Sequence, residues 1–205
     1  MPDPAKTDID IAARALVLIG ASPISSFSDG SSESTVASNI YEDLARGLLT
    51  SYRWRFATGQ EQLSRLADAP VSRWDAAYQL PSGLLMLHAV TVSDFVIDYD
   101  RYEDMVYCNA SSNDTVVADY TFRVNENKWP PYFIELAELT LASHFASAIA
   151  RSGEIAKEYA QKAELQARRS RSLDSQSQTT RRVDTSYLTR GRRSRSSPRI
   201  TLTYD

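Results

Sequence analysis

Four carboxylates crowd into the segment VIDYDRYED, and carboxylate oxygens are ligands that calcium prefers. Asp98 and Asp100 share one face if this segment is a strand, because successive side chains of a strand alternate, and Glu103 and Asp104 follow. A loop that wraps calcium also has a glycine at its sharp turn, and this segment has none. We therefore interpret the four residues as a solvated acidic face that protects a sheet edge, and we predict no metal site.

Two histidines are the chain's only candidates for imidazole chemistry. His88 lies in the apolar run LLMLHAV, which predicts a strand residue with a partly buried ring, and His144 is expected as a hydrogen-bonded core or interface residue of a helix. The sequence contains no GxSxG, no GxGxxG and no phosphate-binding loop with Gly-Lys-Ser/Thr. We therefore predict a protein that is not an enzyme and has no cofactor. A catalytic site assembled from Asp98, Asp100 and His144 is the alternative.

Arginine is concentrated near the C-terminus, where it could bind phosphates or an acidic protein surface. Residues 168–199 contain ten arginines against Asp174 and Asp184, so this segment carries +8 and the rest of the chain −11, for a total of −3. Large apolar residues are too few for segment 171–205 to fold alone. Val183, Tyr187 and Leu188 are nevertheless apolar anchors, which favours docking on a protein. Binding of nucleic acid, and a solvated tail without a partner, are the alternatives.

Helix signals flank a middle segment with the alternating pattern of strands. Caps and apolar stripes predict helices at residues 8–19, 33–51, 131–151 and 154–169, and period-two patterns with turn residues predict strands within 54–124. A hairpin loop is expected at residues 109–114. The predicted fold is α+β: an antiparallel bundle of about four helices, a β-rich insertion between the second and third helices, and an extended C-terminal tail. The body is placed at residues 1–170 and the tail at 171–205.

Two arginines alternate with three aromatic residues in YRWRFAT, where the second helix ends. If this stretch is a strand, Tyr52, Trp54 and Phe56 share one face, and Arg53 and Arg55 the other. The aromatic face is expected to pack in the core at the point where helix and strand meet. The lone cysteine, Cys108, excludes an internal disulfide and is interpreted as a small strand hydrophobe. No signal peptide and no membrane span are expected, and folding in a reducing cytoplasm is predicted.

Several short motifs together resemble one phage protein family. A helix followed by LIGASPISSFSDGS, a second helix that ends in YRWRFAT, then QLSRL, WDAAYQLPSGLL and a helix that begins at WPPYF are similar to head-to-tail adaptors of short-tailed phages, also called tail tubular protein A. The similarity spans roughly residues 8–170. Its most specific pieces lie at Trp54–Ala57 and Ala77–Pro81. The residues that carry this signature are Tyr52, Trp54, Phe56, Tyr78, Pro81 and Trp129.

The resemblance implies a virion structural protein of the neck or tail, made in the cytoplasm of a bacterial host. It implies a ring of twelve subunits under the portal protein that extends the channel for double-stranded DNA and provides the platform for the tail nozzle protein. It also implies that the C-terminal segment docks into the portal. The tail residues expected to make that contact are Arg181, Arg182, Val183, Tyr187, Leu188, Arg190, Arg192, Arg193 and Arg195.

The acidic body fits a channel wall along which DNA must slide without sticking. In such a body, Arg53 and Arg55 are expected to pair with carboxylates of a neighbouring subunit rather than with DNA. The alternative function is a nucleic-acid-binding protein that acts through its arginine-rich tail.

Overall fold

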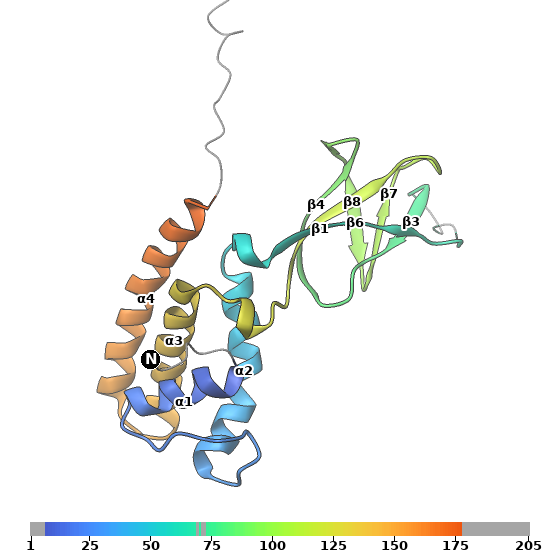
Figure 1. Ribbon diagram of the computed structural model, residues 1–205. Coiled ribbons are helices and arrows are strands. Elements are labelled where there is room, and N and C mark those ends of the chain that lie inside the picture. The colour runs from blue at the N-terminus through green and yellow to red at the C-terminus, as the bar shows by residue number, and fades with distance from the viewer. Residues whose placement is uncertain (1–6, 69, 71–72, 178–205) are drawn as a thin grey trace, which may run out of the picture.

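A computed structural model describes residues 7–68, 70 and 73–177. Within this range the chain forms a helical body and a β body, which Figure 1 shows side by side. The tail residues predicted to dock on the portal, Arg181 to Arg195, lie outside the described residues. In the part of the chain that is described, no helix is both long and apolar enough to cross a membrane.

Four α-helices form the helical body. They are α1 (Asp8–Leu18), α2 (Ser32–Thr50), α3 (Pro131–Ala148) and α4 (Gly153–Ser175). The start of a helix leaves backbone amides without partners, and a capping side chain can accept their hydrogen bonds, while a proline has no amide hydrogen to satisfy. Thr7 and Asp10 form a capping box for α1, the Ser31 hydroxyl accepts a hydrogen bond from the Ser34 amide, and α3 opens with Pro131. α4 continues past residue 169, its predicted end, because its last turns are held against the rest of the body.

α3 lies at the centre of the helical body, with α4 along one side and α1 and α2 on others (Figure 1). Its apolar stripe packs in one cluster with the aromatic residues that follow α2 and precede α3. The large side chains that are fully buried here are Ile11, Leu16, Leu49, Trp54, Phe133, Leu136, Leu141 and Phe145. One hydrophobic core therefore holds all four helices together.

The β body contains eight short strands in two antiparallel sheets. The strands are β1 (Thr58–Gln62), β2 (Ser64–Arg65), β3 (Ala76–Gln79), β4 (Leu84–Val92), β5 (Phe95–Val96), β6 (Tyr99–Tyr102), β7 (Met105–Cys108) and β8 (Val116–Phe122). One sheet has the order β1-β8-β4-β5 and the other β2-β3-β7-β6. Side chains from both sheets meet in a second core that contains Tyr78, Val90, Val106, Cys108, Val116 and Ala118.

The predicted fold needs correction. The α+β class holds, but the picture of a helical bundle that carries a β-rich insertion is wrong. Strands make up much of the middle of the chain, and they close two four-stranded sheets over a core separate from that of the helices. The physical reason is that the alternating segments supply enough inward-facing Val, Ala and Tyr side chains to bury each other without the helices.

Two local predictions are also wrong. Residues 109–114 do not form a hairpin loop, because β7 pairs with β3 and β6 while β8 pairs with β1 and β4. The loop instead carries the chain from one sheet to the other. The strand expected from Trp54 onward begins only at Thr58, after a short 3₁₀ turn, η1 (Arg55–Ala57). A second 3₁₀ turn, η2 (Glu126–Lys128), precedes α3.

Candidate functional site

The end of α2 forms an aromatic corner where the chain passes from the helical body into β1. Trp54 is fully buried, and its indole Nε1 donates a hydrogen bond to the Leu48 carbonyl at 2.8 Å. Its ring centroid lies 5.0 Å from that of Tyr52 and 5.1 Å from that of Phe133, in edge-to-face contact. Phe56 packs edge-on against Phe133 at 4.9 Å. These contacts place the corner inside the helical core, where aromatic pairs add to the stability gained from burial alone.

The other signature residues divide between the two cores. Trp129 lies in the helical core, with its ring centroid 4.8 Å from that of Phe133 and its indole nitrogen 2.9 Å from the Val124 carbonyl. Tyr78 is buried in the core of the β body. Pro81 is half-buried at a turn, where its carbonyl accepts a hydrogen bond from the Leu84 amide. The sequence signature therefore marks both bodies rather than one site.

The two arginines of the corner have different environments. The Arg53 guanidinium lies 3.3 Å from an Asp119 carboxylate oxygen on β8, so its ion pair is within its own chain. Asp119 also accepts a hydrogen bond from the Gln60 side chain at 2.6 Å. Arg55 has an exposed side chain and no salt bridge to any described residue. Of the pair, Arg55 is the one whose charge is available at the surface.

A buried carboxylate fixes the last turns of α4 to this corner. Asp174 has no exposed surface, and its two oxygens accept hydrogen bonds from the Arg55 amide at 3.2 and 3.0 Å. One of these oxygens also accepts a hydrogen bond from the Tyr132 hydroxyl at 2.9 Å. Burial and the adjacent Asp174 carboxylate raise the pKa of Tyr132 above its ordinary value. The carboxylate thus satisfies a backbone donor and a phenol that would otherwise be unpaired in the protein interior.

Two more polar side chains of α4 lie on the same buried face. Gln166 and Ser170 both donate hydrogen bonds to the Tyr132 carbonyl, at 3.2 and 2.8 Å, and Gln166 also binds Glu135 at 2.8 Å. Arg171 lies on the outer side, with its guanidinium carbon 5.7 Å from the centre of the Tyr52 ring. The last described turns of α4 are therefore fixed beside the corner.

Sequence reasoning missed this polar contact surface. Gln166 falls in the helix predicted at residues 154–169 and Asp174 in the predicted tail, and no burial was expected of either, since polar residues are usually solvated. The signal that could have revealed them is their spacing along the helix. They recur at intervals of four in register with Ala163, which also is buried.

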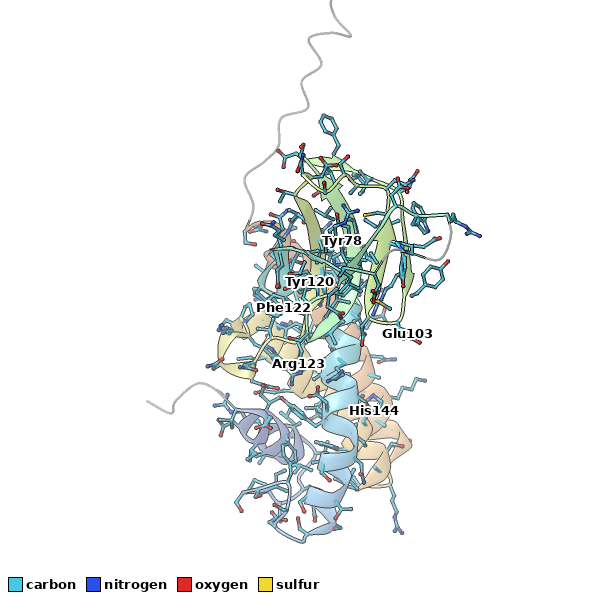
Figure 2. The ribbon with its side chains drawn as sticks, turned by 90° about the vertical axis from the view of Figure 1, so that its right-hand side faces the viewer. Tyr78, Glu103, Tyr120, Phe122, Arg123 and His144 are labelled. Carbon is cyan, nitrogen blue, oxygen red and sulfur yellow. The ribbon has the colours of Figure 1, made fainter. Side chains whose placement is uncertain are left out.

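A second polar network joins the two bodies. Arg123, directly after β8, donates hydrogen bonds to Glu42 of α2 at 3.0 Å and to Glu126 of η2 at 2.5 Å. Burial works against the charge of Arg123, but the two carboxylates outweigh it and raise the pKa of the guanidinium. Tyr41 donates a hydrogen bond to Glu126 at 3.1 Å, and burial together with this carboxylate raises the pKa of Tyr41. Figure 2 shows Arg123 at the boundary between the bodies.

The structure does not bring together the residues of the alternative catalytic site. Asp98 and Asp100 lie in the β body, whereas His144 is exposed on α3 in the helical body, where Figure 2 labels it. Asp100 accepts hydrogen bonds from the Trp74 indole at 3.0 Å and the Tyr102 hydroxyl at 3.3 Å. Among the described residues, no group of three or more His, Cys, Asp or Glu side chains is arranged to hold a metal ion.

His88 is a strand residue, as its sequence predicts. It lies in β4, partly buried, with its Nε2 atom 2.7 Å from the Thr121 hydroxyl oxygen of β8. Burial lowers its pKa, and the nearby Arg53 charge lowers it further, while Asp119 acts in the opposite direction. Cys108 is fully buried in the β core, and burial raises the pKa of its thiol, so it is not poised to react as a thiolate.

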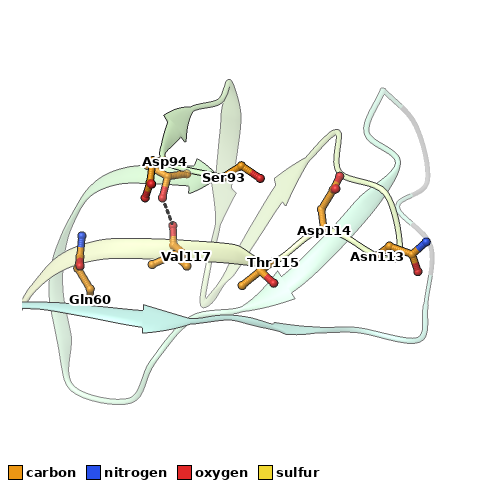
Figure 3. Close-up of a pocket in the computed structure, with 8 residues that line it drawn as sticks. Gln60, Ser93, Asp94, Asn113, Asp114, Thr115 and Val117 are labelled. Atoms are coloured by element: carbon orange, nitrogen blue, oxygen red, sulfur yellow. Dashed lines mark hydrogen bonds between the residues drawn. The ribbon is translucent and has the colours of Figure 1, made fainter.

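The β body also has an open polar hollow (Figure 3). It lies beside β8 and the β4–β5 turn, and its lining residues are Gln60, Thr91, Ser93, Asp94, Asn113, Asp114, Thr115 and Val117. The Thr91 hydroxyl donates a hydrogen bond to the Val117 carbonyl at 3.4 Å. Most of its side chains are polar, and its two carboxylates, Asp94 and Asp114, are not accompanied by a histidine, cysteine, lysine or arginine among the lining residues.

Comparison with known proteins adds no assignment. No protein-family model matches the chain, and no curated protein matches it. The functional interpretation therefore rests on the motifs of the sequence and on the arrangement at the aromatic corner.

Proposed function

We propose that this chain is a structural protein of a phage virion, the head-to-tail adaptor that forms a ring under the portal, extends the DNA channel and provides the attachment platform for the tail. In this function it has no catalytic activity and no cofactor. Its partners are other copies of the chain, the portal protein and the tail nozzle protein, and double-stranded DNA passes without sequence-specific binding.

The observation that carries this proposal is the attachment of α4 to the aromatic corner. Asp174 fastens the last turns of α4 to the Arg55 amide, and the arginine-rich segment begins directly after them. A cationic segment that starts from a rigid point suits a docking element, because only the segment itself must be ordered on binding. The acidic remainder of the chain, at −11, suits the wall of a channel for DNA.

Reconstitution with the portal of the same phage tests the proposal. The full chain should bind the portal ring and appear in electron micrographs as an added ring on its axis. Removal of residues 178–205 should abolish portal binding while leaving thermal unfolding of the body unchanged. A variant with Val183, Tyr187 and Leu188 changed to serine keeps every arginine and is the matched control for charge alone; it should bind the portal more weakly.

The nucleic-acid alternative predicts the opposite pattern. In a mobility-shift titration, tight DNA binding with a steep salt dependence that disappears when residues 178–205 are removed would favour it. In that case the serine variant should bind DNA as well as the unchanged chain. Absence of portal binding together with such a DNA titration would overturn the adaptor proposal.

A further inference from the structure

One face of α4 has no partner among the described residues. The helix packs on α3 through Ala163, Gln166, Ser170 and Asp174, all of which are buried. On the opposite side the exposed fraction of Leu165 is 65%, a large value for an apolar side chain in a helix. By helical spacing, Arg168 and Arg169 lie one turn beyond Leu165 on that same side, and both are exposed. Arg168 is paired with Glu164 of the same helix at 2.5 Å, whereas Arg169 forms no salt bridge with any described residue. This face of α4 therefore combines an exposed apolar side chain with one uncompensated positive charge.

The outer face of α2 has complementary properties. Asp43 is exposed there and forms no ion pair with any described residue, whereas its neighbour Glu42 is held by Arg46 and Arg123. One turn beyond Asp43 is Gly47, in the interior of the helix. The face thus offers an uncompensated negative charge next to a position without a side chain.

No contact with a described residue explains the glycine at position 47. A glycine inside a helix is destabilising relative to alanine, since it has more conformational freedom to lose. A Cβ atom added at Gly47 would meet no atom within 4 Å, and the backbone there is that of an ordinary helix. Close approach of a side chain from another molecule would explain why the position is empty.

The two faces lie on opposite sides of the helical body, with α3 between them (Figure 1). We propose that the α4 face of one copy packs on the α2 face of the next copy. Leu165 then lies over Gly47, and Arg169 faces Asp43. Because each copy uses two different faces, the contact is head-to-tail and adds copies in one direction, as a ring or filament requires.

Charge favours a second copy in this arrangement over a symmetric pair. Contact of two α4 faces would place Arg168 and Arg169 against the same arginines of the other copy. Contact of α4 with α2 instead brings Arg169 to Asp43, a carboxylate that forms no salt bridge with any described residue. The inference rests on the proposed function only for closure into a ring, and the contact itself can be tested with this chain alone.

Sedimentation velocity of the full chain over a concentration series tests the contact. Self-association is expected at protein concentrations below about 1 mM. Arg169→Glu and Asp43→Arg should each weaken it about tenfold, because each places like charges opposite each other, and the double variant should recover most of the loss. Val17→Glu, at another exposed apolar position on α1, is the control and should leave self-association unchanged.

Gly47→Ala separates the contact from folding. Alanine should raise the unfolding temperature of the dilute monomer and at the same time weaken self-association, a combination that damage to the fold cannot produce. A rise in unfolding temperature with unchanged association would overturn the assignment of Gly47 to the interface.

Mixing two defective variants tests the head-to-tail geometry. Leu165→Glu blocks the α4 face and Gly47→Trp blocks the α2 face, so each variant alone should be monomeric. Their mixture retains one intact face of each kind and should give a dimer that grows no further. Failure of the mixture to pair, or a wild-type chain that stays monomeric up to about 1 mM, would overturn the inference.

The outcome is distinguishable from failure of the proposed function. Self-association through these faces without portal binding would leave the contact established and the adaptor function refuted. Portal binding by a wild-type chain that does not self-associate would support the adaptor function and refute the contact.

Discussion

The helical body and the β body bury different kinds of side chain. The helical core is built around large aromatic residues, with Trp54, Phe133 and Phe145 completely inaccessible to solvent. The fully buried residues of the β core are smaller, with Val90 and Val106 as examples. A core built on a few large groups concentrates its stability in single residues, whereas a core of small groups spreads it over many. Truncation of one side chain should therefore harm the helical body more.

The two bodies also differ in how they treat buried polarity. In the helical body, the buried Asp174 receives hydrogen bonds from the Arg55 amide and the Tyr132 hydroxyl. In the β body, the Thr121 hydroxyl is buried and contacts the partly exposed His88. Removing the partners of a fully buried carboxylate costs much stability, whereas breaking a neutral hydrogen-bonded pair at the edge of solvent costs much less. The following predictions test this difference, beginning with the largest effect.

Trp54→Ala should have the largest effect. It removes a fully buried indole that packs against Tyr52 and Phe133, and it should lower the free energy of unfolding by about 3 to 5 kcal/mol. Urea denaturation followed by circular dichroism measures this change. Phe95→Ala is the control, since Phe95 is 76% exposed on the β5 strand and its loss should be nearly neutral. A loss below about 1 kcal/mol at Trp54 would show that the corner is not part of the core.

Asp174→Ala should have the next largest effect. It leaves the Arg55 amide and the Tyr132 hydroxyl unpaired, and the expected cost is about 2 to 4 kcal/mol. Hydrogen exchange should also become faster at the Arg55 amide. Ser177→Ala lies just beyond the helix and provides a control at the same end of α4. Unchanged exchange at Arg55 in the Asp174 variant would contradict the role assigned to this carboxylate.

Val106→Ala should be milder and should act on the β body. It removes two methyl groups from a fully buried position, with an expected loss of about 1 to 2 kcal/mol. Faster hydrogen exchange in β3 and β7 should accompany it, while the amides of α3 keep their protection. Equal loss of protection in both bodies would show that the two cores unfold as one unit.

His88 should give the smallest effect, visible as a pH dependence. Burial lowers its pKa in the folded chain below the ordinary value of 6.5, so the unfolded chain binds a proton first as the pH falls. Stability contributed by neutral His88 is therefore complete above pH 6.5 and is lost as the pH falls from there through the lowered folded pKa. Urea midpoints between pH 7.5 and 5 should fall less in His88→Gln than in the unchanged chain. In a His144→Gln control the full decline should persist.

Local patterns in the sequence predicted the elements better than their assembly. The stripes and caps placed the four helices. Alternation predicted strands within residues 54–124, and in β8 it holds for the buried Val116, Ala118 and Tyr120 but breaks at Thr121, which is also buried. Strand partners could not be read in the same way, because pairing depends on contacts between distant segments. The hairpin at residues 109–114 was wrong for this reason, since the chain there crosses between sheets.

The aromatic corner shows where sequence information ends. Its composition marked Tyr52, Trp54 and Phe56 as core residues, and the structure places all three in or against the helical core. The opposite arginines were expected to behave alike, yet Arg53 is paired with Asp119 and Arg55 is free of salt bridges to described residues. Asp174 was counted only as a charge within the arginine-rich segment.

The sequence by itself determined the helices, the alternating strands, the burial of the large aromatic residues and the uneven distribution of charge. These follow from spacing along the chain, which sets which side chains share a face. Only the tertiary structure decided that the strands close into two sheets with their own core, and that Asp174 binds the Arg55 amide 119 residues away in sequence. Such contacts join segments that are far apart in the sequence. Whether they meet depends on how the intervening segments pack, and a local sequence pattern does not encode that packing.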